Sequence, residues 1–173
     1  VLQKGTELGI VAFVPLLCAR NVVRDPGAAR KREKRWRAII REAAEQSHRG
    51  RLPRLEQPLP FAEACQQAEA AGGLPLLAWE GETATSLKQA LRDAAQSDQQ
   101  PSPGVISPDG SGGPALSSVQ LLVGPEGGFA PEEVDQARAH SIRPISLGRR
   151  ILRAETAGIV AAAAILYESG DLG

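Results

Sequence analysis

The chain has 173 residues, enough for one domain with its own core, and its formal net charge is zero. Aromatic residues make up only 3% of it, so aliphatic side chains and alanines must fill that core. No stretch approaches the roughly 18 uninterrupted apolar residues of a membrane helix, and no segment resembles a signal peptide. These features argue against a membrane or exported protein, and we expect a cytoplasmic one.

The charges are strongly segregated along the chain. Between positions 24 and 54 there are eleven Arg or Lys against four Asp or Glu, whereas the rest of the chain has nine against sixteen. Such a basic segment is typical of proteins that bind phosphate backbones. The alternative is a solvated helix face with internal ion pairs, such as Glu33 with Arg37.

The first half of the chain predicts a strand and a long helix. The apolar run 10–14 is rich in β-branched residues and predicts a buried strand that ends at Pro15. Residues 28–47 predict an amphipathic helix, and Gly50 and Pro53 after it prevent the helix from continuing. Its apolar face is formed by Trp36, Ile40, Ala43 and Ser47.

The second half alternates between strands and helices. Strands are expected at residues 74–79, 119–123 and 144–147, and helices at 61–71, 83–96, 131–140 and 155–168. Residues 97–118 are rich in Ser, Pro, Gly and Asp, which predicts a flexible insertion. Ala130 cannot supply the hydroxyl half of a capping box for the helix at 131–140. The last helix is apolar nearly all round, which indicates burial on more than one side, as in a dimer.

Two glycine-containing loops follow predicted strands. GPEGG at 124–128 follows the strand 119–123, and LGRRILRAETA at 147–157 begins at the end of the strand 144–147. In open α/β sheets ligands bind outside the carboxyl ends of the strands, and glycine lets the main chain approach a ligand closely. We therefore predict one pocket formed by both loops. A nucleotide triphosphatase is disfavoured, because GPEGGF lacks the Lys-Ser/Thr of a Walker loop and no GxGxxG is present.

Together these loops resemble the RsmE family of 16S ribosomal RNA uridine-N3 methyltransferases, which belongs to the SPOUT superfamily. The resemblance extends to KGTELGI at 4–10 and to residues 35–53, while 55–118 match weakly. It implies an α/β fold of the SPOUT type, with a mostly parallel sheet, flanking helices and a deep C-terminal trefoil knot. Residues 1–173 would then be the methyltransferase domain, and the PUA-like N-terminal RNA-binding domain of the family is expected to be absent.

The resemblance also implies a function. S-adenosylmethionine would donate a methyl group to N3 of a uridine in 16S ribosomal RNA of the small subunit, in a homodimer and without a metal. Two alternatives stay open, a SPOUT methyltransferase acting on another RNA and an RNA-binding module without turnover. Cys18 and Cys65 stand alone, with no CxxC spacing, and we expect them to be buried thiols.

The resemblance assigns the site residues as follows. The cofactor would contact Leu122, Gly124, Glu126, Gly127, Ile145, Leu147, Gly148, Leu152, Thr156 and Ala157. Arg153 and Glu155 are the predicted catalytic residues. Phosphates of the RNA would contact Arg35, Arg37, Arg41, Arg49, Arg51, Arg149 and Arg150.

Each charged assignment has a physical reason. The Arg153 guanidinium would stabilise negative charge on the uracil ring during transfer. The carboxylate of Glu126 or Glu155 would attract the cationic sulfonium, although Glu126 alternatively caps its own loop and Glu155 alternatively stabilises the helix start. His48 and His140 lie outside the two loops, so the general base is unassigned.

Overall fold

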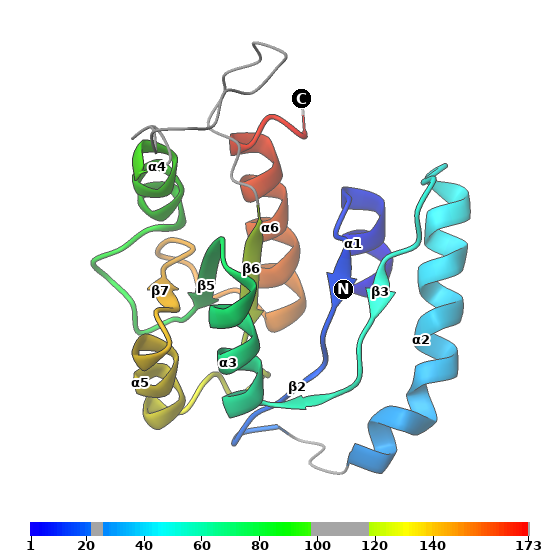
Figure 1. The fold of residues 1–173 in the computed structure, drawn as a ribbon, viewed down its shortest axis with the longest axis horizontal. Coiled ribbons are helices and arrows are strands. Elements are labelled where there is room, and N and C mark those ends of the chain that lie inside the picture. The colour runs from blue at the N-terminus through cyan, green and yellow to red at the C-terminus, as the bar shows by residue number, and fades with distance from the viewer. Residues whose placement is uncertain (22–25, 98–117, 173) are drawn as a thin grey trace.

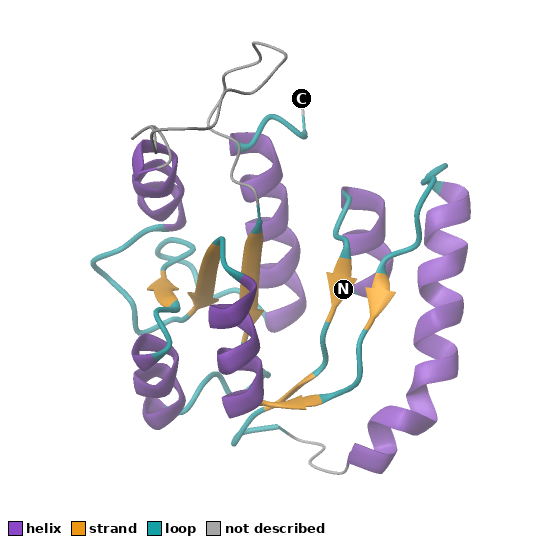
Figure 2. Cartoon of the chain, viewed as in Figure 1, coloured by secondary structure: helices purple, strands orange, loops and turns teal. Residues whose placement is uncertain are grey.

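The computed structural model describes residues 1–21, 26–97 and 118–172, which form a mixed α/β fold with parallel strands (Figure 1). The helices are α1 (Leu2–Leu8), α2 (Pro26–Gln46), α3 (Phe61–Ala71), α4 (Leu87–Ser97), α5 (Pro131–Ala139) and α6 (Ala154–Glu168). The strands are β1 (Ala12–Phe13), β2 (Leu16–Leu17), β3 (Arg54–Leu55), β4 (Leu59–Pro60), β5 (Leu74–Ala78), β6 (Val119–Val123) and β7 (Arg143–Ile145). Figure 2 shows helices around the central group of strands, with α1 and α2 near the β1–β3 pair and the β2–β4 pair near α3.

The central sheet is parallel and has the strand order β6-β5-β7. Ala78, the last residue of β5, is level with Val123, the last of β6, and with Ile145, the last of β7. All three strands therefore end at the same height. We call this end of the sheet the carboxyl edge, and the loops that leave it are the ones expected to bind a ligand.

The central strand β5 is buried on both faces of the sheet. Leu77 packs in a core cluster with Phe61 of α3 and Val134 of α5, whereas Leu76 packs in a second cluster with Leu91 of α4 and Ala161 of α6. Both leucines are 0% exposed. Neighbouring strand residues point to opposite faces, so a strand covered on both sides requires the continuous apolar sequence that β5 has.

Two shorter parallel pairs, β1 with β3 and β2 with β4, continue the strand region beyond the central sheet. The predicted strand at 10–14 is interrupted at Pro15 but resumes in β2. Pro15 has no N–H to donate, yet its carbonyl accepts the N–H of Leu59 at 3.0 Å, so the ladder continues past it. The prediction of a strand that ends at Pro15 is confirmed, because β1 ends at Phe13, whereas β2, β3 and β4 were not predicted.

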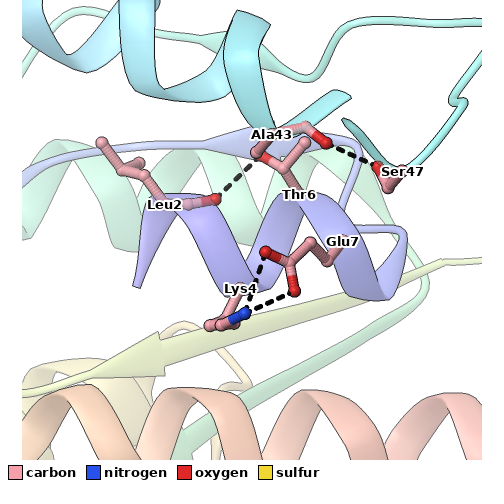
Figure 3. Close-up of polar contacts among 6 residues, drawn as sticks. All are labelled: Leu2, Lys4, Thr6, Glu7, Ala43 and Ser47. Carbon is pink, nitrogen blue, oxygen red and sulfur yellow. Dashed lines mark hydrogen bonds and ion pairs between the residues drawn. The ribbon is translucent and has the colours of Figure 1, made fainter. Parts of the chain in front are cut away.

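The helix α1 lies against α2 (Figure 3). Gly5 is buried against the segment that follows α1, since a Cβ there would come within 2.8 Å of the side chains of Ile10 and Phe13. Thr6 is 0% exposed, and its Oγ1 donates to the carbonyl four residues back at 2.8 Å. Ser47 in the turn after α2 does the same at 2.7 Å, so both hydroxyls are satisfied locally. On the open side, Lys4 and Glu7 form an ion pair at 2.7 Å.

The predicted fold class is confirmed, since parallel strands are flanked by helices. The expected elements at 61–71 and 119–123 match α3 and β6 to the residue, and the helix expected at 28–47 corresponds to α2. The expected trefoil knot stays a prediction. The insertion expected at 97–118 falls almost wholly outside the residues that the structure describes.

One helix begins later than expected. The sequence predicted a helix at 83–96, but α4 starts at Leu87. The carboxylate of Glu82 accepts the main-chain N–H groups of Ala84 and Thr85 at 2.7 and 3.0 Å and so holds this segment in a turn. None of the helices described is long and apolar enough to cross a membrane.

Candidate functional site

The loop 124–130 after β6, here called the glycine loop, makes a tight turn at the carboxyl edge. The N–H of Gly128 donates to the carbonyl of Pro125 at 2.9 Å, and Gly128 has a φ of +67°, which other residues rarely adopt. A Cβ on Gly124 would lie 3.2 Å from Phe129, so this glycine is closely packed. Gly127 is exposed, and its main chain is accessible to a ligand.

Glu133 holds the glycine loop against the segment that follows β2. Its side chain is buried, at 8% exposure. One carboxylate oxygen accepts the N–H of Ala130 and the other accepts the N–H of Ala19, both at 2.8 Å. Ala130 has no hydroxyl, so α5 has only the acidic half of a capping box, as predicted. Glu133 therefore joins two segments that are more than a hundred residues apart in the sequence.

A third loop, 79–86, follows the central strand, and we call it the central loop. The carboxylate of Glu80 lies against Gly128 of the glycine loop. The guanidinium of Arg138 lies over the ring of Trp79 at 5.7 Å and pairs with Glu82 at 3.9 Å. Burial works to raise the pKa of Glu82, but main-chain N–H groups of the following turn and the Arg138 charge lower it overall. The central loop is thus fixed by α5.

The loop after β7, residues 146–153, crosses the carboxyl edge and is called the second glycine loop. The N–H of Ser146 donates to the carbonyl of Thr85 at 2.8 Å, which attaches it to the central loop. Gly148 has a φ of +108° and donates its N–H to the Ser146 hydroxyl at 3.2 Å. The loop then leads into α6, where a Cβ on Gly158 would lie 3.8 Å from Val123 at the end of β6. The second glycine loop therefore runs from the end of β7 to the end of β6.

The residues predicted to contact the cofactor lie on these two loops, at the ends of the preceding strands and at the start of α6. Three of them have buried side chains, namely Leu122, Ile145 and Ala157. Three are half-buried, namely Gly124, Leu147 and Leu152. Four are exposed, namely Glu126, Gly127, Gly148 and Thr156. Because β6 and β7 flank β5, the loops leave the sheet roughly 10 Å apart before the second one crosses over.

The predicted catalytic residues lie at the first turn of α6. The main chain of Arg153 is the N-cap, and its carbonyl accepts the N–H of Ala157 at 2.8 Å, while its side chain is exposed. Glu155 is exposed in the first turn, where the helix dipole favours a carboxylate. Arg149 and Arg150 are exposed on the second glycine loop. The structure thus exposes three arginines and one glutamate along the second glycine loop and the first turn of α6.

The arginines predicted to contact RNA fall into two groups. Arg35, Arg41 and Arg51 are exposed on α2 and in the segment after it. Arg37 pairs with Glu33 at 2.8 Å, as the solvated-face alternative expected, and Arg49 is directed inward. Nη1 of Arg49 donates to the carbonyls of Thr6 and Ile10 at 3.0 and 2.9 Å, and its Nη2 donates to that of Gly9 at 3.1 Å. This geometry fits a structural role for Arg49 better than a phosphate contact.

The two cysteines are buried beside the glycine loop, as expected. Burial, with a further effect of the Glu133 charge, raises the pKa of Cys18 to about 12 and that of Cys65 to about 11. Both thiols are therefore protonated at neutral pH and are poor nucleophiles. Within the described ranges, no group of three or more His, Cys, Asp or Glu side chains is placed to hold a metal.

Three residues at the carboxyl edge were not predicted, namely Arg20, Glu80 and Glu133. Arg20 donates from Nη1 to the carbonyl of Gly127 at 3.1 Å. Its partner is distant in sequence, and no local pattern indicates the contact. The position of Glu133, three residues after Ala130, was the one signal available, because that spacing is typical of a capping glutamate.

The chain belongs to a family of RNA methyltransferase domains, whose family model matches residues 1–166. Two curated relatives carry the name ribosomal RNA small subunit methyltransferase E. The Bacillus subtilis protein is 35% identical over 98% of this chain and 60% of its own length. The Synechocystis protein is also 35% identical, over 95% of this chain and 47% of its own length. The resemblance to RsmE is thereby confirmed, and the chain spans about half to three fifths of these relatives.

Solved structures agree with this assignment. A Legionella pneumophila protein in complex with the bound cofactor S-adenosylmethionine superposes with a TM-score of 0.74 and 31% identity, over 96% of this chain and 59% of that one. A ribosomal RNA small subunit methyltransferase E of Neisseria gonorrhoeae bound to S-adenosylmethionine gives a TM-score of 0.71 and 30% identity, over 96% and 58%. The fold of the chain is therefore that of methyltransferases that bind this cofactor.

Proposed function

We propose that this chain is the catalytic domain of an S-adenosylmethionine-dependent methyltransferase that modifies N3 of a uridine in 16S ribosomal RNA. The observation that carries the proposal is the carboxyl edge, where two glycine loops meet the ends of three parallel strands. Relatives named for small-subunit ribosomal RNA methylation support the substrate. Neighbours that bind S-adenosylmethionine support the cofactor. The cytoplasm, where the small subunit is available, is the proposed location.

The residues at the carboxyl edge suit the cofactor. S-adenosylmethionine supplies an electrophilic methyl group on a cationic sulfonium. Exposed main chain at Gly127 and Gly148 would contact its adenosine part, and the carboxylates of Glu126 and Glu155 would attract its positive charge. The cofactor residues proposed above are all within the two loops, their strand ends or the first turns of α6.

The proposed reaction moves a methyl group from sulfur to nitrogen. The S–CH3 bond breaks, an N3–CH3 bond forms, and the N3 proton passes to a base. Removing that proton leaves negative charge on the two uracil oxygens, which the exposed Arg153 guanidinium would stabilise. Arg149 and Arg150 would hold neighbouring phosphates. The exposed arginines of α2 would guide the rest of the RNA by charge.

The outer face of α6 is the proposed contact in a homodimer. Val160 is 43% exposed and Tyr167 is 70% exposed on this helix, and Ile151 in the preceding loop is 90% exposed. Apolar side chains this exposed are typical of an interaction surface. Because α6 begins at the carboxyl edge, a second copy on this face would lie next to the cofactor site.

Calorimetric titration of S-adenosylmethionine, combined with a methyl-transfer assay on 16S ribosomal RNA, tests the proposal. Gly127→Val should abolish cofactor binding, because a Cβ there already lies 3.1 Å from Arg20 and a larger side chain would displace the loop. Gly50→Val is the matched control, since nothing lies within 4 Å of a Cβ at Gly50. Arg153→Ala should keep cofactor binding but lose turnover. No binding by the folded wild-type chain would refute the proposal and favour an RNA-binding module without turnover.

A further inference from the structure

We infer that Arg20 is a further substrate-binding residue, whose guanidinium is held at the glycine loop and binds a backbone phosphate of the RNA beside the cofactor. This inference rests on the proposed function. It concerns a residue in the segment after β2, outside both glycine loops and outside the arginines of α2.

The position of Arg20 is fixed by the main chain of the glycine loop. Its Nη1 donates to the carbonyl of Gly127 at 3.1 Å. A Cβ on Gly127 would lie 3.1 Å from the Cβ of Arg20, so the Arg20 side chain packs against this glycine from its first atom. The residue is nonetheless exposed. A guanidinium has five N–H donors in a planar fork, and the bond to Gly127 leaves others for a phosphate.

The glycine loop is also held by contacts that do not involve Arg20. Buried Glu133 already joins Ala19, next to Arg20, with Ala130 at the other end of the loop. Arg49 shows how this chain uses an arginine purely to brace its main chain, since it is half-buried and donates to three carbonyls. Arg20 differs on both counts, because it is exposed and makes one such bond. Its geometry suits a residue that is pre-organised to bind an external anion.

The charges around the glycine loop are separated in a way that fits two ligands. Arg20 lies on Gly127, and the carboxylate of Glu80 lies on the adjacent Gly128. The Glu80 carboxylate would add to those of Glu126 and Glu155 in favouring a cationic sulfonium, whereas the Arg20 guanidinium favours an anionic phosphate. Arg20 would therefore bring a phosphate of the RNA backbone to Gly127 of the glycine loop.

The test compares Arg20→Ala and Arg20→Lys with Arg92→Ala, a matched control because Arg92 is exposed on α4. Cofactor affinity is measured by calorimetry, RNA affinity with a labelled 16S ribosomal RNA fragment at several salt concentrations, and turnover as kcat and KM. For Arg20→Ala we expect RNA affinity to fall and KM to rise roughly tenfold, because a charge-assisted hydrogen bond is removed. A plot of the logarithm of the RNA association constant against the logarithm of the salt concentration has a negative slope. Its magnitude should decrease by about 0.7, the value for one single-strand phosphate. Arg20→Lys should recover part of the RNA affinity.

Other outcomes separate this inference from the proposed function. If Arg20→Ala weakens cofactor binding while RNA affinity and its salt slope stay unchanged, Arg20 is only a brace and the inference is wrong. It is also wrong if Arg20→Ala behaves like Arg92→Ala. Glu133→Gln is the reference for a purely structural residue. It should reduce cofactor affinity and leave the salt dependence of RNA binding unchanged. Wild-type protein that binds RNA but neither binds nor uses S-adenosylmethionine would refute the proposed function, while the RNA titration would still decide the role of Arg20.

Discussion

Arg49 lies within the basic segment of the sequence, but its side chain donates hydrogen bonds to main-chain carbonyls. Its guanidinium donates to the carbonyls of Thr6, Gly9 and Ile10, around the end of α1. Gly9 has a φ of +111° and ends the helix, and its N–H donates to the carbonyl of Thr6 at 3.2 Å. Arg49 gives that carbonyl a second donor, pairs the carbonyls of Gly9 and Ile10 just beyond the helix, and joins the turn after α2 to the end of α1.

Arg49→Ala should therefore destabilise the fold by about 1–3 kcal/mol, because it removes the hydrogen bonds from the guanidinium to the main-chain carbonyls of Thr6, Gly9 and Ile10. Urea unfolding measures this change. Arg51→Ala is the control, since Arg51 is exposed and its removal should alter stability by less than about 0.5 kcal/mol. Equal stability of the Arg49→Ala variant and the wild type would show that solvent replaces the guanidinium at no cost.

The buried thiols predict how stability depends on pH. The folded-state pKa values of Cys18 and Cys65 are about 12 and about 11, both raised from 9.0. As the pH rises above 9.0 the unfolded chain loses its thiol protons first, so folding stability is unaffected below that pH and decreases above it. The decrease is at most about 1.4 kcal/mol for each pH unit and each thiol.

Cys18→Ala with Cys65→Ala removes both titrating groups and provides the comparison. Above pH 9.0 the unfolding free energy of the wild type should decrease relative to that of the double variant. A thiol reagent should also react slowly with the native chain and rapidly in urea. Rapid reaction of the native chain would show that the glycine loop opens frequently, because Cys18 packs in the same cluster as Phe129 of that loop.

At the scale of single elements, α6 has two contrasting faces. Ala157, Ala161 and Ala162 are buried against the rest of the chain, whereas Val160 and Tyr167 are exposed. Val160→Glu together with Tyr167→Glu should convert a homodimer into monomers, because each apolar side chain contributes on the order of 1–2 kcal/mol to the interface. Sedimentation measures the shift in association.

A charge added elsewhere is the control for that experiment. Ala70→Glu adds a carboxylate on the exposed side of α3 and should leave the association unchanged. A monomeric wild type, or a double variant that associates as strongly as the wild type, would contradict the assignment of the α6 face. Methyl transfer by the monomeric variant would further show whether the second copy is needed at the site.

The second element with a testable role is α2. Arg35 and Arg41 are exposed, whereas Arg37 pairs with Glu33 at 2.8 Å. Arg35→Ala with Arg41→Ala should lower the salt slope of RNA binding by about 0.7 for each phosphate that is no longer neutralised. Arg37→Ala should have a smaller effect, because its charge is already partly compensated. Equal effects of all three arginines would indicate a diffuse attraction without individual phosphate partners.

Sequence patterns predicted elements where one interaction type dominates. The mostly apolar β6 and the alanine-rich α3 have the expected bounds, because local composition and the flanking glycines or prolines indicate where they begin and end. The short strands β3 and β4 were missed, because prolines and charged residues surround them and their pairing is with distant residues. The late start of α4 was missed because a single carboxylate, that of Glu82, decides it.

At the scale of the whole molecule, the sequence predicted two loops that leave the same edge of the sheet, but not the contacts that hold them there. Both glycine loops follow apolar strands, and glycines at positions 124, 127 and 148 indicated them. The central loop has no such signal, yet it lies between them because β5 is the middle strand. The strand order 6-5-7 results from long-range packing on both faces of β5, which local periodicity does not contain.

Because all three loops leave one edge of a doubly covered sheet, a ligand held there should stabilise the entire fold. S-adenosylmethionine at a hundredfold excess over its Kd should add about 2.7 kcal/mol to the unfolding free energy. Amide hydrogen exchange should slow most at residues 79–86, 124–130 and 146–153. The exchange rates in α2 should change little. Arg49→Ala should lower the stability of the free protein but keep this increment, since it acts at α1, whereas Gly127→Val should lose the increment. Slower exchange confined to α2 would place the cofactor outside the carboxyl edge.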